Sequence, residues 1–155
     1  MIEDYLAAGA LIEDRIRDKV PEIRRVEGVG DLTTLLENDA EEFLKQISGK
    51  LPSAFVGFDG ETIGDMAGNG SDHVAGQRYL VVLAVGNYRR ADTNKGVVDT
   101  AGPLLSKLVA ALSGWKPMGF TELIRQAAPR PGYRAGVGFF PLVFTTDLFV
   151  EGLTE

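Results

Sequence analysis

The sequence contains no cysteine, one histidine and no apolar run as long as a membrane-spanning helix requires. The absence of cysteine excludes disulfides, thiolate metal sites and cysteine nucleophiles. Because His73 is the only histidine, a metal site with several histidine ligands cannot form within one copy. The acidic start of the chain, at residues 1–4, is not followed by an apolar stretch with a cleavage site, so we expect no secretory signal.

The acidic residues are distributed unevenly along the 155 residues. Residues 1–65 contain 15 Asp and Glu against 7 Lys and Arg, a net charge of −8, whereas residues 66–155 carry a net charge of +2. An acidic first part argues against that region binding nucleic acid, which requires clustered Lys and Arg. The asymmetry is compatible with a solvated acidic surface, or with head-to-tail contact between copies.

The apolar periodicity predicts a single α+β domain over residues 1–155. We expect a mainly antiparallel sheet of about four to five strands, with two to three helices packed on one face. Strands are expected at residues 22–29, 53–58, 77–88, 120–125 and 138–149, with 77–88 in a central position. Helices are expected at residues 2–20, from Asp31 to a stop at Gly49, and at 97–113, where Pro103 is expected to be the first residue of the regular part.

Residues 59–76 are rich in glycine and poor in large apolar side chains, which predicts a long flexible loop. The loop matches no standard nucleotide or calcium motif. Gly68 and Gly70 fit a dinucleotide fingerprint, but His73 fills the sixth place and a strand follows instead of a helix. A calcium loop starting at Asp59 fails at Ile63, where an acidic ligand is needed. We therefore interpret this segment as a mobile hairpin tip that contacts another protein.

Several stretches of the chain together resemble the tail terminator, or tail completion, proteins of tailed bacteriophages, particularly the Mu-like prophage group. They are "MIEDYLAAGALIEDRIRDKVPEIRRV", "RYLVVLAVGNYR", "LVAALSGWKP", "FTELIRQ", "PGYRAG" and "GFFPLVFTTDL". The resemblance covers about residues 1–150 and lies in the order and spacing of these stretches.

The resemblance implies a structural virion protein of the tail or neck, assembled in the bacterial cytoplasm, and not an enzyme. Such proteins form a hexameric ring on the end of the tail tube and end its polymerisation. One face of the ring meets the tail tube protein, the other receives the head-tail connector protein, and DNA passes through the channel without specific binding. No membrane, cofactor or metal is implied, and no residue inherits a catalytic role.

A head-to-tail ring needs two different patches on each copy. Charge complementarity suggests an acidic helix carrying Glu37, Glu41 and Glu42 on one side. The other patch would carry Arg89, Arg90 and Lys95. The loop at residues 64–76 is expected to extend toward an axial partner, the tube or the connector, through Met66, Asn69, Asp72 and His73. An acidic lining of the channel would let DNA slide, since like charges repel.

Two alternatives remain open. The first is another neck or head-tail adaptor protein with a related fold. The second is a small cytoplasmic enzyme or ligand-binding domain that uses the glycine-rich loop. Its site would combine Asp65, Asp72, His73 and Arg78, with His73 as a base.

Overall fold

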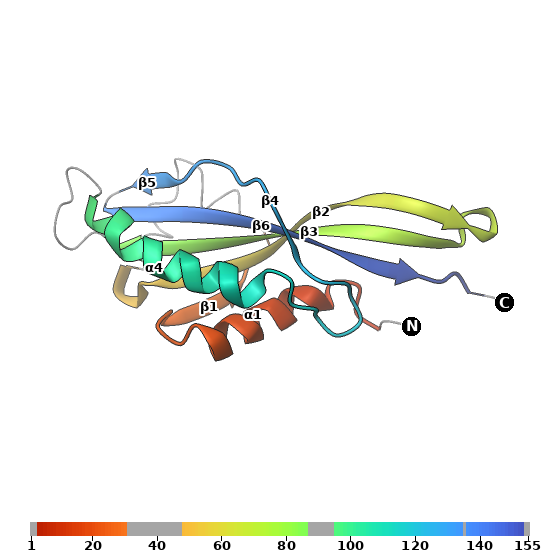
Figure 1. The fold of residues 1–155 in the computed structure, drawn as a ribbon, viewed down its shortest axis with the longest axis horizontal. Coiled ribbons are helices and arrows are strands. Elements are labelled where there is room, and N and C mark those ends of the chain that lie inside the picture. The colour runs from red at the N-terminus through yellow and green to blue at the C-terminus, as the bar shows by residue number, and fades with distance from the viewer. Residues whose placement is uncertain (1–2, 31–47, 87–94, 135, 154–155) are drawn as a thin grey trace.

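The computed structural model describes residues 3–30, 48–86, 95–134 and 136–153, without the side chains of Ser48 and Lys95. Within these ranges the chain is an α+β domain with a six-stranded, mostly antiparallel sheet and two α-helices (Figure 1). In chain order the elements are α1 (Ala7–Lys19), β1 (Arg25–Gly28), η1 (Ser48–Lys50), β2 (Ser53–Ala67), η2 (Gly68–Gly70), β3 (Asp72–Gly86), α4 (Lys95–Leu112), β4 (Ile124–Gln126), β5 (Gly132–Arg134) and β6 (Val137–Val150).

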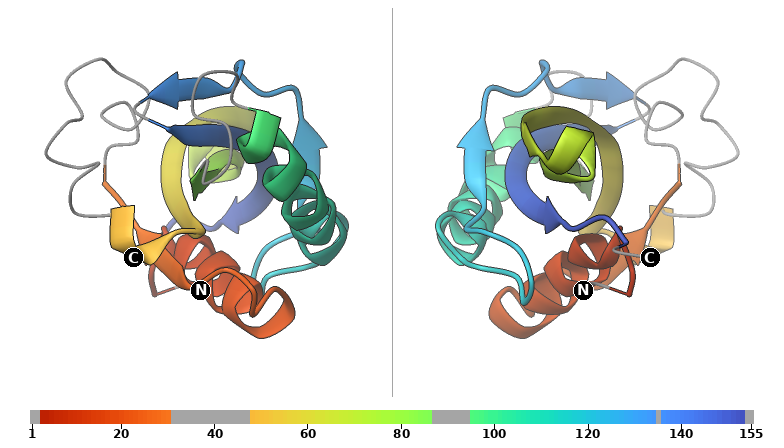
Figure 2. Two further views of the ribbon diagram at one scale, coloured as in Figure 1. Left: turned by 90° about the vertical axis from the view of Figure 1, so that its left-hand side faces the viewer. Right: turned by 90° about the vertical axis from the view of Figure 1, so that its right-hand side faces the viewer.

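Three long strands form the centre of the sheet, whose order is β1-β2-β3-β6-β4, with β5 also pairing with β6. Only the β1–β2 pair is parallel. β3 lies between β2 and β6, which confirms the expected central position of the segment that begins at residue 77. Viewed along the long axis, the three strands wind strongly around one another (Figure 2), as the right-handed twist of neighbouring strands requires.

The main hydrophobic core lies between one face of this sheet and the two helices. Alternate residues of each strand point to this face because side chains alternate along a strand. From β3 these are Tyr79, Val81, Leu83 and Val85. Both helices lie on the same side of the sheet (Figure 1), as the sequence predicted. Their buried stripes recur every three or four residues: Ala8, Ile12 and Ile16 in α1, and Val97, Ala101, Leu104 and Leu108 in α4.

The opposite face of the sheet carries a smaller buried cluster. It includes Phe55 of β2, Val82 of β3, and Phe139 and Val143 of β6. The central strands are therefore apolar on both faces, which explains the unbroken apolar run from Leu80 to Val85.

The helices differ from the sequence-based expectation at Pro103. Pro103 does not begin α4 but lies inside it, because the helix already starts at Lys95. Pro103 is exposed, while the residues on the other side of the helix are buried against the sheet, so packing sustains the helix across the missing backbone donor. α4 approaches β6 closely at Gly138, where any Cβ would overlap Cγ1 of Val97. The helix expected after Asp31 lies outside the described residues.

The predicted loop at residues 59–76 is wrong. The structure shows β2 and β3 continuing as a hairpin through almost all of this range, joined by η2. The hairpin contains register shifts between Phe58 and Glu61 and between Ile63 and Met66. Extra residues at such bulges break the two-residue alternation by which a strand is recognised. β5 was also unexpected, and the short strand expected at 120–125 is β4, at Ile124–Gln126.

We predict that Leu108→Ala lowers the free energy of unfolding by about 2–5 kcal/mol, because Leu108 is fully buried between α4 and the sheet. Chemical denaturation measures this change. Leu153→Ala is the matched control: it removes the same atoms from a side chain that is 86% exposed, and should change stability by less than about 0.5 kcal/mol. Equal effects of the two substitutions would contradict the proposed core.

Candidate functional site

The three central strands extend beyond the helices as a narrow three-stranded tongue (Figure 1). We define the tongue as residues 58–67 of β2, 72–78 of β3, and 145–150 of β6 with Glu151, together with the turn at residues 68–71. From Phe58 onward, almost every β2 residue is exposed, in contrast to the buried residues at 53–57. On β3 and β6 a few residues of the tongue are buried, among them Leu148, which belongs to the main core. The tongue thus continues the backbone pairing of the sheet without a separate core of its own.

A chain of hydrogen bonds, buried at Tyr79 and Gln77, holds the base of the tongue against the N-terminal segment. Tyr79 Oη donates to Gln77 Oε1 at 2.7 Å, and Gln77 Nε2 donates to the backbone oxygen of Tyr5 at 2.8 Å. The Tyr5 hydroxyl in turn donates to the Glu61 carboxylate. Burial raises the pKa of Tyr79 above its ordinary value, so this hydroxyl stays protonated and continues to donate. Gln77 is fully buried, and its amide has one partner on β3 and one in the segment that precedes α1.

The turn at the tip has a defined backbone. Gly68, Asn69 and Gly70 all have positive φ angles, of 59°, 61° and 90°. Glycine adopts this region at no steric cost, and Asn tolerates it better than most residues. Ser71 Oγ donates to the Gly68 carbonyl at 2.8 Å, and the Asp72 carboxylate accepts the backbone N–H of Gly152 at 3.0 Å. The second bond ties the turn to the segment that follows β6.

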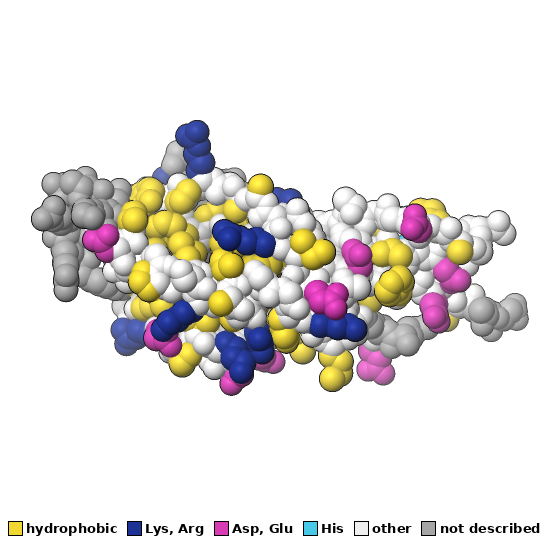
Figure 3. Space-filling view, viewed as in Figure 1, with side chains coloured by type: hydrophobic (Ala, Val, Ile, Leu, Met, Phe, Trp, Pro, Cys, Tyr) yellow, Lys and Arg dark blue, Asp and Glu magenta, His cyan; other side chains and the backbone are white. Residues whose placement is uncertain are grey.

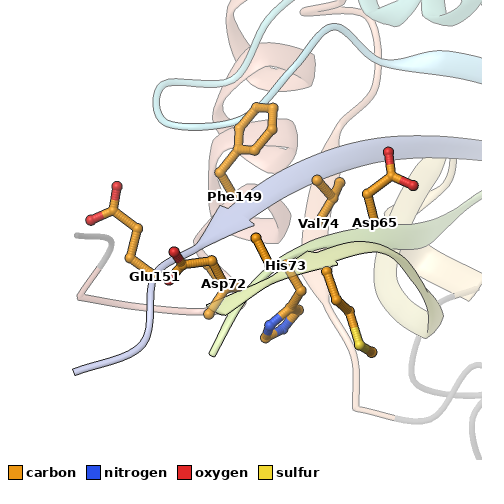
Figure 4. Close-up of a pocket in the computed structure, with 9 residues that line it drawn as sticks. Asp65, Asp72, His73, Val74, Phe149 and Glu151 are labelled. Atoms are coloured by element: carbon orange, nitrogen blue, oxygen red, sulfur yellow. The ribbon is translucent and has the colours of Figure 1, made fainter. Parts of the chain in front are cut away.

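A hollow of about 360 Å³ lies near the tip, lined by residues 65–67, 72–74 and 149–151. Phe149, Val74 and Asp65 lie on one side of the sheet, and His73 points to the other (Figure 4). The lining combines exposed apolar groups with carboxylates: Phe149 is 70% exposed and Met66 is 64% exposed. Such exposure of large apolar side chains is typical of a surface that contacts another protein.

The tongue carries most of the net negative charge of the chain. It contains six carboxylates and no Lys, with Arg78 as the only basic residue apart from His73, which gives a net charge of −5 out of −6. Acidic side chains are seen on the tongue, whereas most of the basic side chains in this view lie on the body (Figure 3). The carboxylates are those of Asp59, Glu61, Asp65, Asp72, Asp147 and Glu151.

The structure brings together four of the residues predicted to contact a partner. Met66, Asn69, Asp72 and His73 lie on or beside the turn of the tongue. By contrast, the four residues of the alternative ligand site do not converge. Asp65, Asp72 and His73 line the hollow, but Arg78 pairs instead with Asp59 at 2.8 Å.

The other predicted contact residues are not assembled into a surface by the described structure. Glu37, Glu41, Glu42, Arg89 and Arg90 lie outside the described residues. Lys95 is the first residue of α4, and its side chain is not described. The contact between an acidic helix and this basic group therefore stays a prediction.

The C-terminal strand contributes residues to this site that were not predicted from the sequence. Phe149 and Glu151 reach the hollow because β6 pairs with β3 from Gly86 to His73, which places Val150 opposite His73. The short apolar run of Leu148, Phe149 and Val150 is compatible with a strand but does not reveal which strand it pairs with.

No helix within the described ranges is long and apolar enough to cross a membrane. Among the same residues, no group of three or more His, Asp or Glu side chains is arranged to hold a metal ion.

Two comparisons with known proteins gave matches. A family model described as "Phage tail terminator protein" matches residues 1–154. The fold is similar to that of a chain in the virion of a native gene transfer agent particle, with a TM-score of 0.52 and 17% sequence identity. The match covers 96% of this chain and 100% of that one. No curated protein matches the sequence.

We predict that Tyr79→Phe lowers the free energy of unfolding by about 1–3 kcal/mol, because it leaves the buried Gln77 Oε1 without its donor. Tyr133→Phe removes the same hydroxyl from a residue that is half-exposed, and should be nearly neutral. Thermal and chemical denaturation of both variants test the difference. A neutral Tyr79→Phe would show that the chain of hydrogen bonds does not stabilise the base of the tongue.

Proposed function

The chain belongs to the phage tail terminator family, and we propose that it forms a hexameric ring that caps the tail tube and ends tube polymerisation. Membership of the family makes it a structural component of the virion tail. The observation that carries the proposal is the tongue, a projecting arm with exposed apolar side chains and no core of its own. An arm of this kind gains stability when another protein covers it.

Ring formation requires a heterologous contact, in which two different patches of one copy meet the corresponding patches of its neighbours. The molecule has a suitable polarity. The tongue carries a net charge of −5, and the rest of the chain carries only −1. Copies arranged head to tail would bring the acidic end of one molecule to a less acidic surface of the next, whereas other arrangements would bring like charges together.

In this proposal the turn at the end of the tongue faces an axial partner, either the tail tube protein or the head-tail connector protein. Met66, Asn69, Asp72 and His73 would make this contact. The fixed turn supports this role, because a preformed element loses less conformational entropy on docking than a mobile one.

Genomic DNA would pass through the ring without specific binding. A protein grips DNA through clustered Lys and Arg, each of which neutralises a phosphate. The net charge of −6 and the absence of Lys from the tongue favour sliding instead of binding.

We expect native mass spectrometry of the purified protein to detect a species of six times 16.7 kDa at high concentration. The same protein added to growing tail tubes of its own phage should stop their elongation, as measured by tube length in electron micrographs. Tubes that reach the same length with and without the protein would contradict the capping role. A ring of a different subunit number would correct the stoichiometry alone.

A second prediction concerns the turn. Replacing residues 67–72 with Asn-Gly joins the directly paired residues Met66 and His73 through a two-residue turn of the kind that closes hairpins. We expect this variant to fold and form rings but to lose capping, because the axial contact is removed. Asn69→Gly is the matched control, since it keeps the length and the backbone conformation of the turn. Normal capping by the shortened variant would show that the turn does not face the partner.

A further inference from the structure

The body carries a basic run opposite in charge to the tongue. Residues 124–136 contain Arg125, Arg130 and Arg134 and no acidic residue. Every residue from 124 to 131 is exposed, including Ile124 at 60%. Arg125 and Arg130 form no ion pair with any residue that the structure describes. The run lies along the outer edge of β6, because β4 and β5 both pair with that strand.

Three carboxylates of the tongue, like Arg125 and Arg130, form no ion pair with a described residue. Within the described part of the chain, the side chains of Asp65, Asp147 and Glu151 have no ion-pair partner. Asp65 and Glu151 line the hollow beside Phe149 (Figure 4). Carboxylates around an exposed aromatic ring form a surface suited to an arginine, whose aliphatic stem packs on the ring while its guanidinium binds the carboxylates.

The β5 end of the run cannot reach the hollow of the same molecule. β5 pairs with residues 137–139 of β6, whereas the hollow lies beside Phe149 on the same strand. Ten residues of a strand span roughly 33 Å, and the strand that joins the two surfaces is continuous. The hollow can therefore receive an arginine of the β5 side of the run only from another copy.

We propose that, in the ring, the tongue of each copy lies against the basic run of the next, and that an arginine of that run enters the hollow on the side of Phe149 and Asp65, opposite to the side to which His73 points. This inference rests on the proposed ring. The contact pairs two different patches, as a closed ring requires. It also covers the arginines of the run, so that they are not available to hold DNA as it passes.

The charge-reversal variant Arg125→Glu, Arg130→Glu tests this contact. We expect the protein concentration at which half of the chains are in rings to rise by on the order of tenfold or more, because attractive contacts become repulsive at every interface. The matched control is Arg24→Glu, Lys50→Glu. It makes the same change in net charge at two exposed basic residues next to β1, away from the run, and should assemble like the wild type. Circular dichroism verifies that all variants are folded.

Reversing the charges on both sides of the contact gives a sharper test than reversing one side. Asp65→Arg, Glu151→Arg alone should also weaken the ring, and the combination of all four substitutions in one chain should restore assembly. A ring that survives Arg125→Glu, Arg130→Glu, or a fourfold variant no better than either pair, overturns the contact while the ring itself stands. A wild-type chain that neither forms rings nor caps tubes overturns the proposed function, and the contact with it.

Discussion

The pairing of β3 with β6 is the constraint on which the rest of the structure depends. Every residue from His73 to Gly86 pairs with one residue of Val137–Val150, so two strands run the full length of the molecule. Over one half of this length, α1 and α4 bury one face of the sheet; over the other half, the sheet projects without them. Since an isolated hairpin is marginal in water, the tongue depends on strands that are already held in the core. The Gln77 hydrogen bonds mark the point where the covered half gives way to the exposed one.

The sequence predicts those parts of the fold in which one periodicity persists. The stripe on α4 and the apolar run of β3 identify their elements because helical and buried-strand patterns continue without interruption. The outer part of β2 was missed for a physical reason. Phe58, Glu61, Ile63 and Met66 pair in turn with Tyr79, Gln77, Ala75 and His73, but two bulges give them a spacing of three, two and three. The glycines in this part of β2 also resemble the composition of a loop. In α4, packing against the sheet overrides the helix-breaking tendency of Pro103.

Four of the residues named from the sequence lie at the candidate site, but the strands that carry them were not predicted. Met66, Asn69, Asp72 and His73 do lie together, because they are close in sequence and share one turn. Phe149 and Glu151 were missed because strand pairing over long sequence separations leaves no local pattern. The distribution of charge in the fold also could not be predicted from positions along the sequence. Dividing the chain at residue 65 assigns the acidity to the N-terminal part, whereas the fold gathers Asp59 to Asp72 with Asp147 and Glu151 on one arm.

The register shifts in β2 also affect the subunit before assembly. β1 covers the outer edge of β2 only as far as Val56, and beyond that point no described strand pairs with this edge. An open edge invites pairing with the edges of other molecules, and proteins counter this with bulges and charged side chains. The edge of β2 has both: two bulges, and the carboxylates of Asp59, Glu61 and Asp65. Both features oppose strand-to-strand stacking of free subunits along this open edge.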